Sequence, residues 1–396
     1  MQNLKYGQRP KEILFLDGLR GLAAIYVLIH HARWLLWEGY NEGYLLHPQS
    51  YTFFDKISVH LFSLFKYGHE AVLLFFVLSG FVIHLRYSLS IKSEGSSAQF
   101  GLSTYLSRRA KRILPPFILA LIFTFIIDSL GTSWEPGIYH GQTPYSSINE
   151  NISSNLSMST LAGNLCFLMK IYVPSWGTNE VLWSLACEFW FYLLYPLLFL
   201  IHRKSRLISS LVVVVLFIIS VVFPLQIPFL AHKIFYYLII WWLGVLLADV
   251  YTGNLNLKFK YLSILSTALI LLPINGIPLL LAPLNPLIIG LGFTGIFAIL
   301  FSMKEDNIFI QSLKRIKWLG NFSYSIYIFH LPLLVFMSGW FIQKYGHLPS
   351  HFGYSMVGIF VSLGISYIFY LIGERPFTKK ITSIKSFFRL SEIGTK

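Results

Sequence analysis

The chain has 396 residues, of which 55% are apolar and only 12% are charged. This composition is too apolar for a water-soluble globular protein. The formal net charge is +14, yet no soluble basic segment is long enough to form a nucleic-acid-binding domain. We therefore expect an integral membrane protein whose contacts include membrane lipids and no nucleic acid.

Apolar runs that could cross a hydrocarbon core recur along the whole chain. Because such a core is about 30 Å thick, a helix of about 20 apolar residues spans it, and the runs predict an all-α bundle of about ten transmembrane helices. One of the two runs 261–277 and 283–302 could be re-entrant, because four prolines crowd their connection. The predicted spans are 13–36, 70–89, 113–130, 181–201, 207–224, 234–252, 261–277, 283–302, 320–340 and 353–373.

The distribution of Lys and Arg predicts the orientation of these spans. Threading the runs alternately with the N-terminus in the cytoplasm places most Lys and Arg on the cytoplasmic side, as the positive-inside rule requires. Both termini, including a basic tail at 378–396, are then cytoplasmic, and the long loops 37–69 and 131–180 face outward. The first run is too long for a cleaved signal peptide and carries charged residues, so we expect it to remain as the first helix.

Two smaller features complete the expected organisation. Within the first outer loop, apolar residues share one helical face, which suggests a short helix lying on the membrane surface. The two cysteines, Cys166 and Cys187, indicate neither a disulfide nor a metal site. The residues of the apolar face are Phe53, Phe54, Ile57, Leu61, Leu64 and Phe65.

The first predicted helix contains ionisable side chains that a passive anchor would not need. Arg20 and His31 are eleven residues apart, so at about 100° and 1.5 Å per residue they share one face about 16 Å apart. Asp17 lies one turn before Arg20 and can pair with its guanidinium. Between them, Ala24 and Val27 leave a narrow stripe along which an elongated group could run.

These residues have a catalytic and a structural interpretation. Imidazole suits proton transfer near neutral pH, so His31 could act as a general base or as an acyl-transfer relay, with Arg20 orienting an anionic or carbonyl group. Alternatively, the same side chains form a polar network that fixes helix packing. The spacing alone does not decide between them.

The run LDGLRGLAAIYVLIHH, with Arg20 and His31, resembles the signature of the membrane-bound acyltransferase family 3, which modifies sugars with acyl groups. Further segments match this family in order along residues 13–377, and we take residues 1–377 as one domain. In two places the pattern differs: Ala186 replaces a serine, and Phe189 replaces an acidic residue that often follows Glu188. The matching segments are Phe75 to Phe81, Arg109 to Pro115, Trp183 to Glu188, Ser323 to His330, and Glu374 to Phe377.

The resemblance implies an O-acyltransferase that takes an acyl group, most simply acetyl, from cytoplasmic acyl-coenzyme A. The acceptor would be a hydroxyl of a cell-envelope glycan or lipid-linked sugar, and the protein would lie in the inner membrane of a bacterium. Arg86, Arg109 and Arg112 are expected to hold the phosphates of coenzyme A, which is a substrate, so neither a tightly bound cofactor nor a metal is expected.

Three later residues are further candidates for the site, and of these we take Glu188 as catalytic. Glu188 could steer a sugar hydroxyl or the imidazolium of His31, or make a structural contact. Ser184 lies one turn earlier and is a possible substrate contact. His330 is another, although a histidine beside Pro332 is more often a packing hydrogen-bonder.

Two other functions fit a helical membrane protein with buried charges. A glycan or lipid exporter would also suit a charged stripe, but exporters of that kind usually show paired halves, and no counterpart of the first-helix cluster occurs in the second half. A purely structural scaffold would leave Arg20 and His31 unexplained.

Overall fold

The computed structural model describes residues 13–223, 229–258, 261, 263, 264, 269 and 279–382. Regular structure in these ranges is helical, apart from an isolated bridge between Met169 and Val173. The all-α prediction is therefore confirmed. The helices are α1 (Leu14–Leu35), α2 (Phe53–Phe62), α3 (Gly68–Glu94), α4 (Leu102–Trp134), α5 (Pro136–Tyr139), α6 (Ser146–Asn151), α7 (Met158–Leu165), α8 (Leu182–His202), α9 (Arg206–Val222), α10 (Phe229–Thr252), α12 (Asn285–Ser302), α13 (Ile308–Arg315), α14 (Lys317–Asn321), α15 (Ser323–Tyr345), α16 (Gly353–Phe369) and α17 (Arg375–Thr382).

Eight helical segments within the described ranges are long and apolar enough to cross a membrane. They agree with eight of the ten predicted runs and make the chain a multi-pass membrane protein. The run at 207–224 forms α9, which is apolar but shorter, at 17 residues. The run at 261–277 lies outside the described residues except for positions 261, 263, 264 and 269, so the count of ten stays a prediction.

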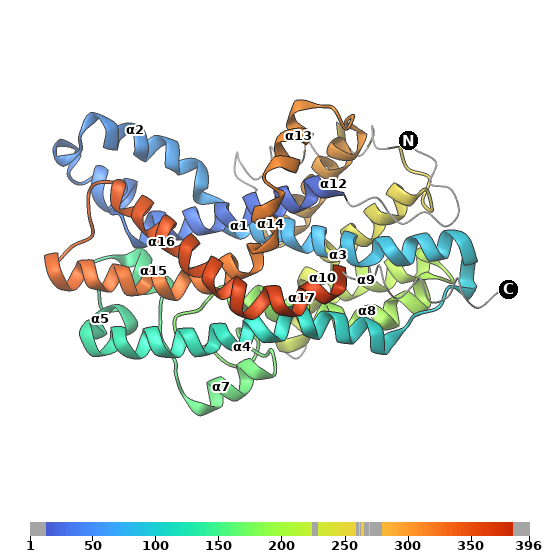
Figure 1. Ribbon diagram of the computed structural model, residues 1–396, viewed down its shortest axis with the longest axis horizontal. Helices are drawn as coiled ribbons and strands as arrows, with labels where there is room; N and C mark the ends of the chain where they lie inside the picture. Colours follow the sequence, from blue (N-terminus) through green and yellow to red (C-terminus); the bar gives the residue numbers. More distant parts are fainter. Residues whose placement is uncertain are drawn as a thin grey trace.

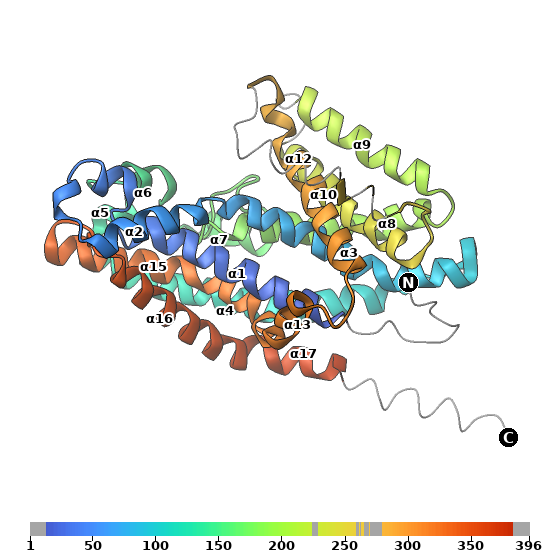
Figure 2. The same ribbon diagram turned by 90° about the horizontal axis from the view of Figure 1, so that it is seen from above.

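Helix α1 lies at the centre of the long-helix bundle. It packs against α3, α15 and α16, while α15 also packs against α4, and these helices run lengthwise side by side in Figure 1. Helices α9, α10 and α12 form a second group that packs against α3 and α8, as the turned view in Figure 2 shows. The short helices α13 and α14 pack against the Arg20 end of α1.

A close helix crossing joins α3 to α10 through two glycines. A Cβ added to Gly80 would lie 2.0 Å from the carbonyl oxygen of Trp241, and one added to Gly244 would lie 2.0 Å from that of Val77. Any side chain would therefore push the backbones apart. Small residues at such crossings allow the close packing that holds helices together in lipid.

Helix α15 contains a proline whose missing hydrogen bond is replaced by a side chain. Pro332 has no N–H to offer the Ile328 carbonyl one turn earlier. The buried amide of Asn179 donates to that carbonyl at 2.9 Å. Asn179 thus joins the segment before α8 to the middle of α15.

The second long loop is fastened to α4 by a buried carboxylate. Asp128 accepts hydrogen bonds from the backbone N–H of Thr178 at 2.6 Å, from its hydroxyl at 2.9 Å, and from the Ser154 hydroxyl at 3.3 Å. Its side chain is fully buried. This anchor holds the loop at Ser154 and Thr178 against α4.

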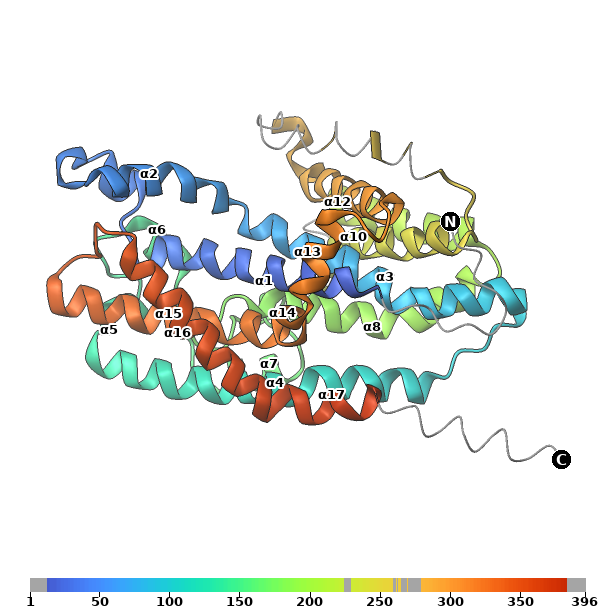
Figure 3. The ribbon, with the colours of Figure 1, turned by 45° about the horizontal axis from the view of Figure 1, so that its top comes forward.

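The first long loop contains the predicted surface helix. Helix α2 is capped by Thr52 and Asp55 and continues as a 3₁₀ turn to Lys66. Apolar side chains of this segment, including Phe53 and Phe54, are exposed, and Figure 3 shows α2 at the periphery of the bundle. An exposed apolar helix of this kind is suited to a membrane surface.

Candidate functional site

The guanidinium of Arg20 is fixed by three partners. Asp17 pairs with it at 3.1 Å, which is the ion pair that the sequence spacing predicts. The Ser323 hydroxyl accepts from Nε at 3.0 Å, and the carbonyl of Gly320 accepts from NH2. Gly320 is necessary for this contact, because a Cβ there would lie 2.2 Å from the Asp17 carbonyl oxygen.

Arg20 lines a cavity that we call the inner chamber. Arg109 and Arg112 of α4 also line it, opposite an apolar wall formed largely by α3. Arg86 is not among the lining residues, so the structure brings together two of the three arginines that were expected to bind coenzyme A. Arg109 lies over the ring of Tyr192, with Cζ 5.7 Å from its centroid.

These arginines lie on a helix rather than in the loop before it. Helix α4 begins at Leu102, well before the predicted start of the span at 113. The prediction was too short because it followed hydropathy, whereas the polar segment before 113 has no helix-breaking residue. The helical turn places Arg109 and Arg112 on one face, three residues apart.

Glu188 also lines the inner chamber and has local partners. Its carboxylate accepts a hydrogen bond from Ser79 at 2.6 Å and another from the Tyr192 hydroxyl. His31 does not line this chamber, so Glu188 contacts no part of the imidazole that it was considered to steer. Ser184 lines the chamber as well and bonds the Tyr327 hydroxyl at 2.6 Å.

His31 lies in a chain of hydrogen bonds that assigns its tautomer. His330 Nδ1 lies 2.9 Å from the Ile326 carbonyl, which only accepts, so this nitrogen carries the hydrogen and Nε2 of the neutral ring has a lone pair. Nε2 of His330 lies 3.0 Å from Nδ1 of His31. Nδ1 of His31 also lies 2.9 Å from the carbonyl oxygen of Val27. The His31 hydrogen is therefore on Nδ1, and Nε2 has the lone pair that a general base requires.

The contact with His330 was not foreseen from the sequence. His330 is fully buried and lines neither cavity described here, so the structure places it behind His31 rather than in contact with a substrate. The signal that could have found it is the spacing on α15. Ser323, Tyr327 and His330 recur at the helical repeat and face Arg20 and His31 in the same order.

A second cavity, which we call the outer cavity, opens at the His31 end of α1. It has a volume of about 490 Å³, within the range of 300 to 1,000 Å³ typical of small-molecule sites. Aromatic side chains and short polar side chains from both long loops form its walls. The lining includes His30, His31, Arg33, Trp34, Trp37, Glu38, Tyr40, Asn41, Glu42, Ser146, Ser147, Glu150, Asn151 and Glu180.

The stripe predicted between Arg20 and His31 is not an open groove. Ala24 and Val27 are buried, because α3 and α15 pack against this part of α1, and they line neither cavity. Tyr327 takes the intermediate position instead. It lines the inner chamber, and its ring centroid lies 6.2 Å from that of His330.

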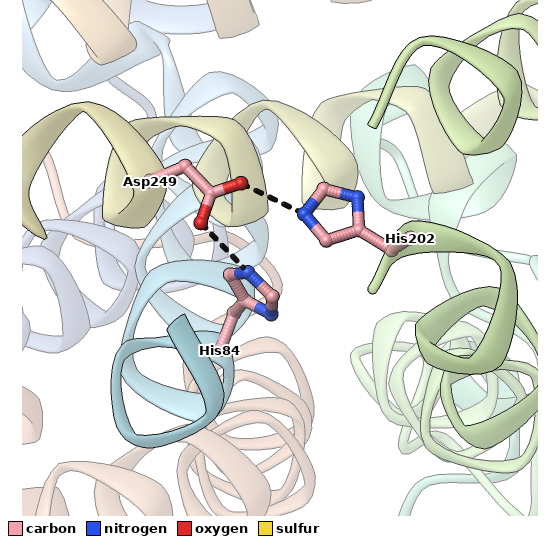
Figure 4. Close-up of side chains that lie close together, drawn as sticks. All are labelled: His84, His202 and Asp249. Carbon is pink, nitrogen blue, oxygen red and sulfur yellow. Dashed lines mark hydrogen bonds and ion pairs between the residues drawn. The ribbon is translucent and has the colours of Figure 1, made fainter. Parts of the chain in front are cut away.

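A buried cluster away from these cavities contains the residue types that bind metals. The possible ligand atoms of His84, His202 and Asp249 lie within 4.8 Å of one another and come from α3, α8 and α10 (Figure 4). The carboxylate is already saturated. Asp249 is 3.2 Å from His84 and 2.7 Å from His202, and it also accepts from Ser88 at 2.5 Å and Arg206 at 3.1 Å. We regard the cluster, with Arg206, as a polar network that joins the four helices α3, α8, α9 and α10.

Comparison with known proteins now identifies the chain's family. The acyltransferase domain of family 3 matches residues 13–371, which is nearly the whole chain. The chain belongs to acyltransferase family 3. This membership confirms the resemblance read from the first-helix signature.

The individual relatives share less than 30% sequence identity with this chain. O-acetyltransferase OatA of Staphylococcus aureus (strain NCTC 8325 / PS 47) is 25% identical over 94% of this chain, which spans 58% of that protein. Putative acetyltransferase ORF330 of Acidianus two-tailed virus is 23% identical over 68% of this chain and 74% of its own. Acyltransferase MdmB of Streptomyces mycarofaciens is 29% identical over 48% of this chain and 40% of its own. No solved structure matches the chain.

Proposed function

We propose that this protein transfers an acetyl group from cytoplasmic acetyl-coenzyme A to a hydroxyl of a cell-envelope glycan or lipid-linked sugar. The observation that carries the proposal is the pair of cavities at the two ends of α1. Arginines line one cavity, and the other is lined by a histidine with a free Nε2. The name of the Staphylococcus relative, an O-acetyltransferase, supports the same reaction.

The inner chamber is suited to the donor. The positive-inside distribution of Lys and Arg supports placing this chamber toward the cytoplasm of a bacterial inner membrane. Arg109 and Arg112 would then bind phosphate groups of coenzyme A, because guanidinium groups form strong, directed hydrogen bonds to phosphate oxygens. Arg20, fixed by Asp17 and Ser323, would orient the pantetheine arm of the donor as it extends toward His31.

The outer cavity is suited to the acceptor. Nε2 of His31 would take the proton of the acceptor hydroxyl while its oxygen bonds to the carbonyl carbon of the thioester. The carbon–sulfur bond then breaks, and the departing thiolate of coenzyme A takes the proton from the imidazolium. The hydrogen bond from Nδ1 of His31 to His330 would keep the ring oriented through both steps.

The thioester must pass the position of Tyr327 to reach His31. Because Tyr327 separates the inner chamber from the histidine pair, its side chain would have to move for each transfer. The family membership favours this acyl-transfer account over an exporter that performs no chemistry.

The test is transfer of labelled acetyl from acetyl-coenzyme A by membranes that contain the wild type, His31→Ala or His140→Ala. His140 is exposed and lines neither cavity, so it is a matched control for loss of an imidazole. We expect the wild type and the control to release coenzyme A and label glycan, and His31→Ala to do neither. An active His31→Ala protein at equal abundance would overturn the proposal.

A further inference from the structure

Arg33 is a charged residue of the outer cavity for which the described residues supply no partner. It lies near the end of α1, two residues after His31, and lines the same cavity. Its Nε atom is buried yet makes no hydrogen bond, and no described carboxylate pairs with its guanidinium. An N–H of a guanidinium that is withdrawn from water without an acceptor is costly, so this arrangement points to an acceptor that arrives with a ligand.

The carboxylates around the cavity do not fill this role, because most of them are engaged elsewhere. Glu42 accepts from the Ser146 hydroxyl at 3.0 Å and from the Ser147 hydroxyl at 2.9 Å. Glu180 pairs with Lys170 at 2.8 Å. These contacts leave the Arg33 guanidinium available.

The two remaining carboxylates of the outer cavity, those of Glu38 and Glu150, form no ion pair with Arg33 either. Glu38 accepts from the Tyr145 hydroxyl at 3.2 Å. Glu150 is exposed, so its charge is screened by water. None of these four carboxylates forms an ion pair with Arg33, so an anionic group of a ligand can reach its guanidinium directly.

We propose that Arg33 binds an anionic oxygen group of the acceptor, a carboxylate or a phosphate, and so selects acidic sugars. This inference rests on the proposed function, since it assigns the acceptor to the outer cavity. Arg33 and His31 leave α1 about 200° apart, so one ligand touching both must extend across the cavity. The half-buried ring of Trp34, which follows Arg33 in sequence and lines the same cavity, can cover a sugar face.

The proposal is tested with a glucuronate-containing tetrasaccharide and the same tetrasaccharide after reduction of its carboxylates to alcohols. A third arm replaces the carboxylate by a sugar phosphate, which distinguishes the two sources of negative charge. The proteins are the wild type, Arg33→Gln, Arg33→Lys and Lys66→Gln. Lys66 is exposed, lies outside the cavity and controls for general loss of positive charge.

The expected result is a change in KM that is confined to acidic acceptors. Because a hydrogen bond to a charged group contributes about 1.5 to 3 kcal/mol, Arg33→Gln should raise the KM for the acidic sugar about 10- to 100-fold. It should leave kcat and the KM for the reduced sugar almost unchanged. The KM of Arg33→Lys for the acidic sugar should lie between those of the wild type and Arg33→Gln. A wild type with a lower KM for the reduced sugar than for the acidic sugar would overturn the inference. So would an Arg33→Gln protein whose KM rises equally for both acceptors.

A binding measurement separates this inference from the proposed reaction. Fluorescently labelled forms of the two tetrasaccharides are titrated into the detergent-solubilised proteins without any donor. Tighter binding of the acidic form by the wild type and its loss in Arg33→Gln support the assignment, even if no acetyl transfer is found. Equal binding of both forms by the wild type contradicts it, whatever the turnover results.

Discussion

Nε2 of His330 lies 3.0 Å from Nδ1 of His31, and this contact determines which nitrogen of His31 is free to react. The two rings come from helices α1 and α15, and the residues are 299 positions apart in sequence. Because His330 is buried and bonded to the Ile326 carbonyl, it holds its lone pair toward His31. The base of the proposed reaction is therefore oriented by its neighbour.

Replacing His330 should weaken catalysis without removing it. In His330→Ala, Nδ1 of His31 keeps the Val27 carbonyl and loses the second acceptor, so the ring is less firmly held. Removing a group that orients a functional histidine typically lowers activity about 10- to 100-fold, and we expect kcat to fall by this amount. The KM for acetyl-coenzyme A should stay the same in assays of coenzyme A release. A His330→Ala protein with normal kcat would show that the contact has no catalytic role.

The pH dependence of the reaction should report the protonation of one imidazole. Because Nε2 of His31 must be unprotonated to accept the hydroxyl proton, kcat should rise with pH and then reach a plateau. On the acid side, the slope should approach one decade per pH unit. The profile is measured over the range in which the protein stays folded. A rate that rises toward acid pH would contradict the role of His31 as a base.

Loss of an arginine from the inner chamber should weaken donor binding. Arg112→Ala removes one guanidinium from the proposed phosphate site, and the KM for acetyl-coenzyme A should rise about 10-fold or more. Lys111→Ala is the matched control, since Lys111 is an exposed neighbour outside the chamber. Equal effects of the two substitutions would indicate that general positive charge, rather than the chamber, binds the donor.

The buried network of Figure 4 should matter for stability. Asp249→Ala leaves His84, His202 and Arg206 without their shared acceptor, and breaking a buried pair of this kind costs about 3 to 5 kcal/mol. We expect a lower thermal unfolding temperature in detergent, whereas Asp306→Ala at an exposed site should behave as the wild type. An unchanged unfolding temperature for Asp249→Ala would show that the network is dispensable.

Features that depend on one helix could be predicted from the sequence. The pairing of Asp17 with Arg20 follows from a separation of three residues, and the spans follow from apolar length. The separation of Arg20 and His31 along one helix follows from the helical rise. These inferences need no knowledge of neighbouring helices.

Features that depend on packing between helices could not be predicted. The contact of His330 with His31 and the closure of the stripe at Ala24 and Val27 depend on how α15 meets α1. The position of Glu188 in the inner chamber depends on α3, which supplies Ser79. The early start of α4 was missed because hydropathy marks the apolar part of a helix and not its end.

The measurement that tests the central claim most directly is the sidedness of transfer in sealed membrane vesicles. Labelled acetyl-coenzyme A is supplied to the cytoplasmic face, and the glycan acceptor is confined to the opposite side. We predict labelled acetyl on the acceptor with the wild type and none with His31→Ala, because the donor and acceptor sites lie at opposite ends of α1. Transfer that occurs only when donor and acceptor share the same side would contradict the account.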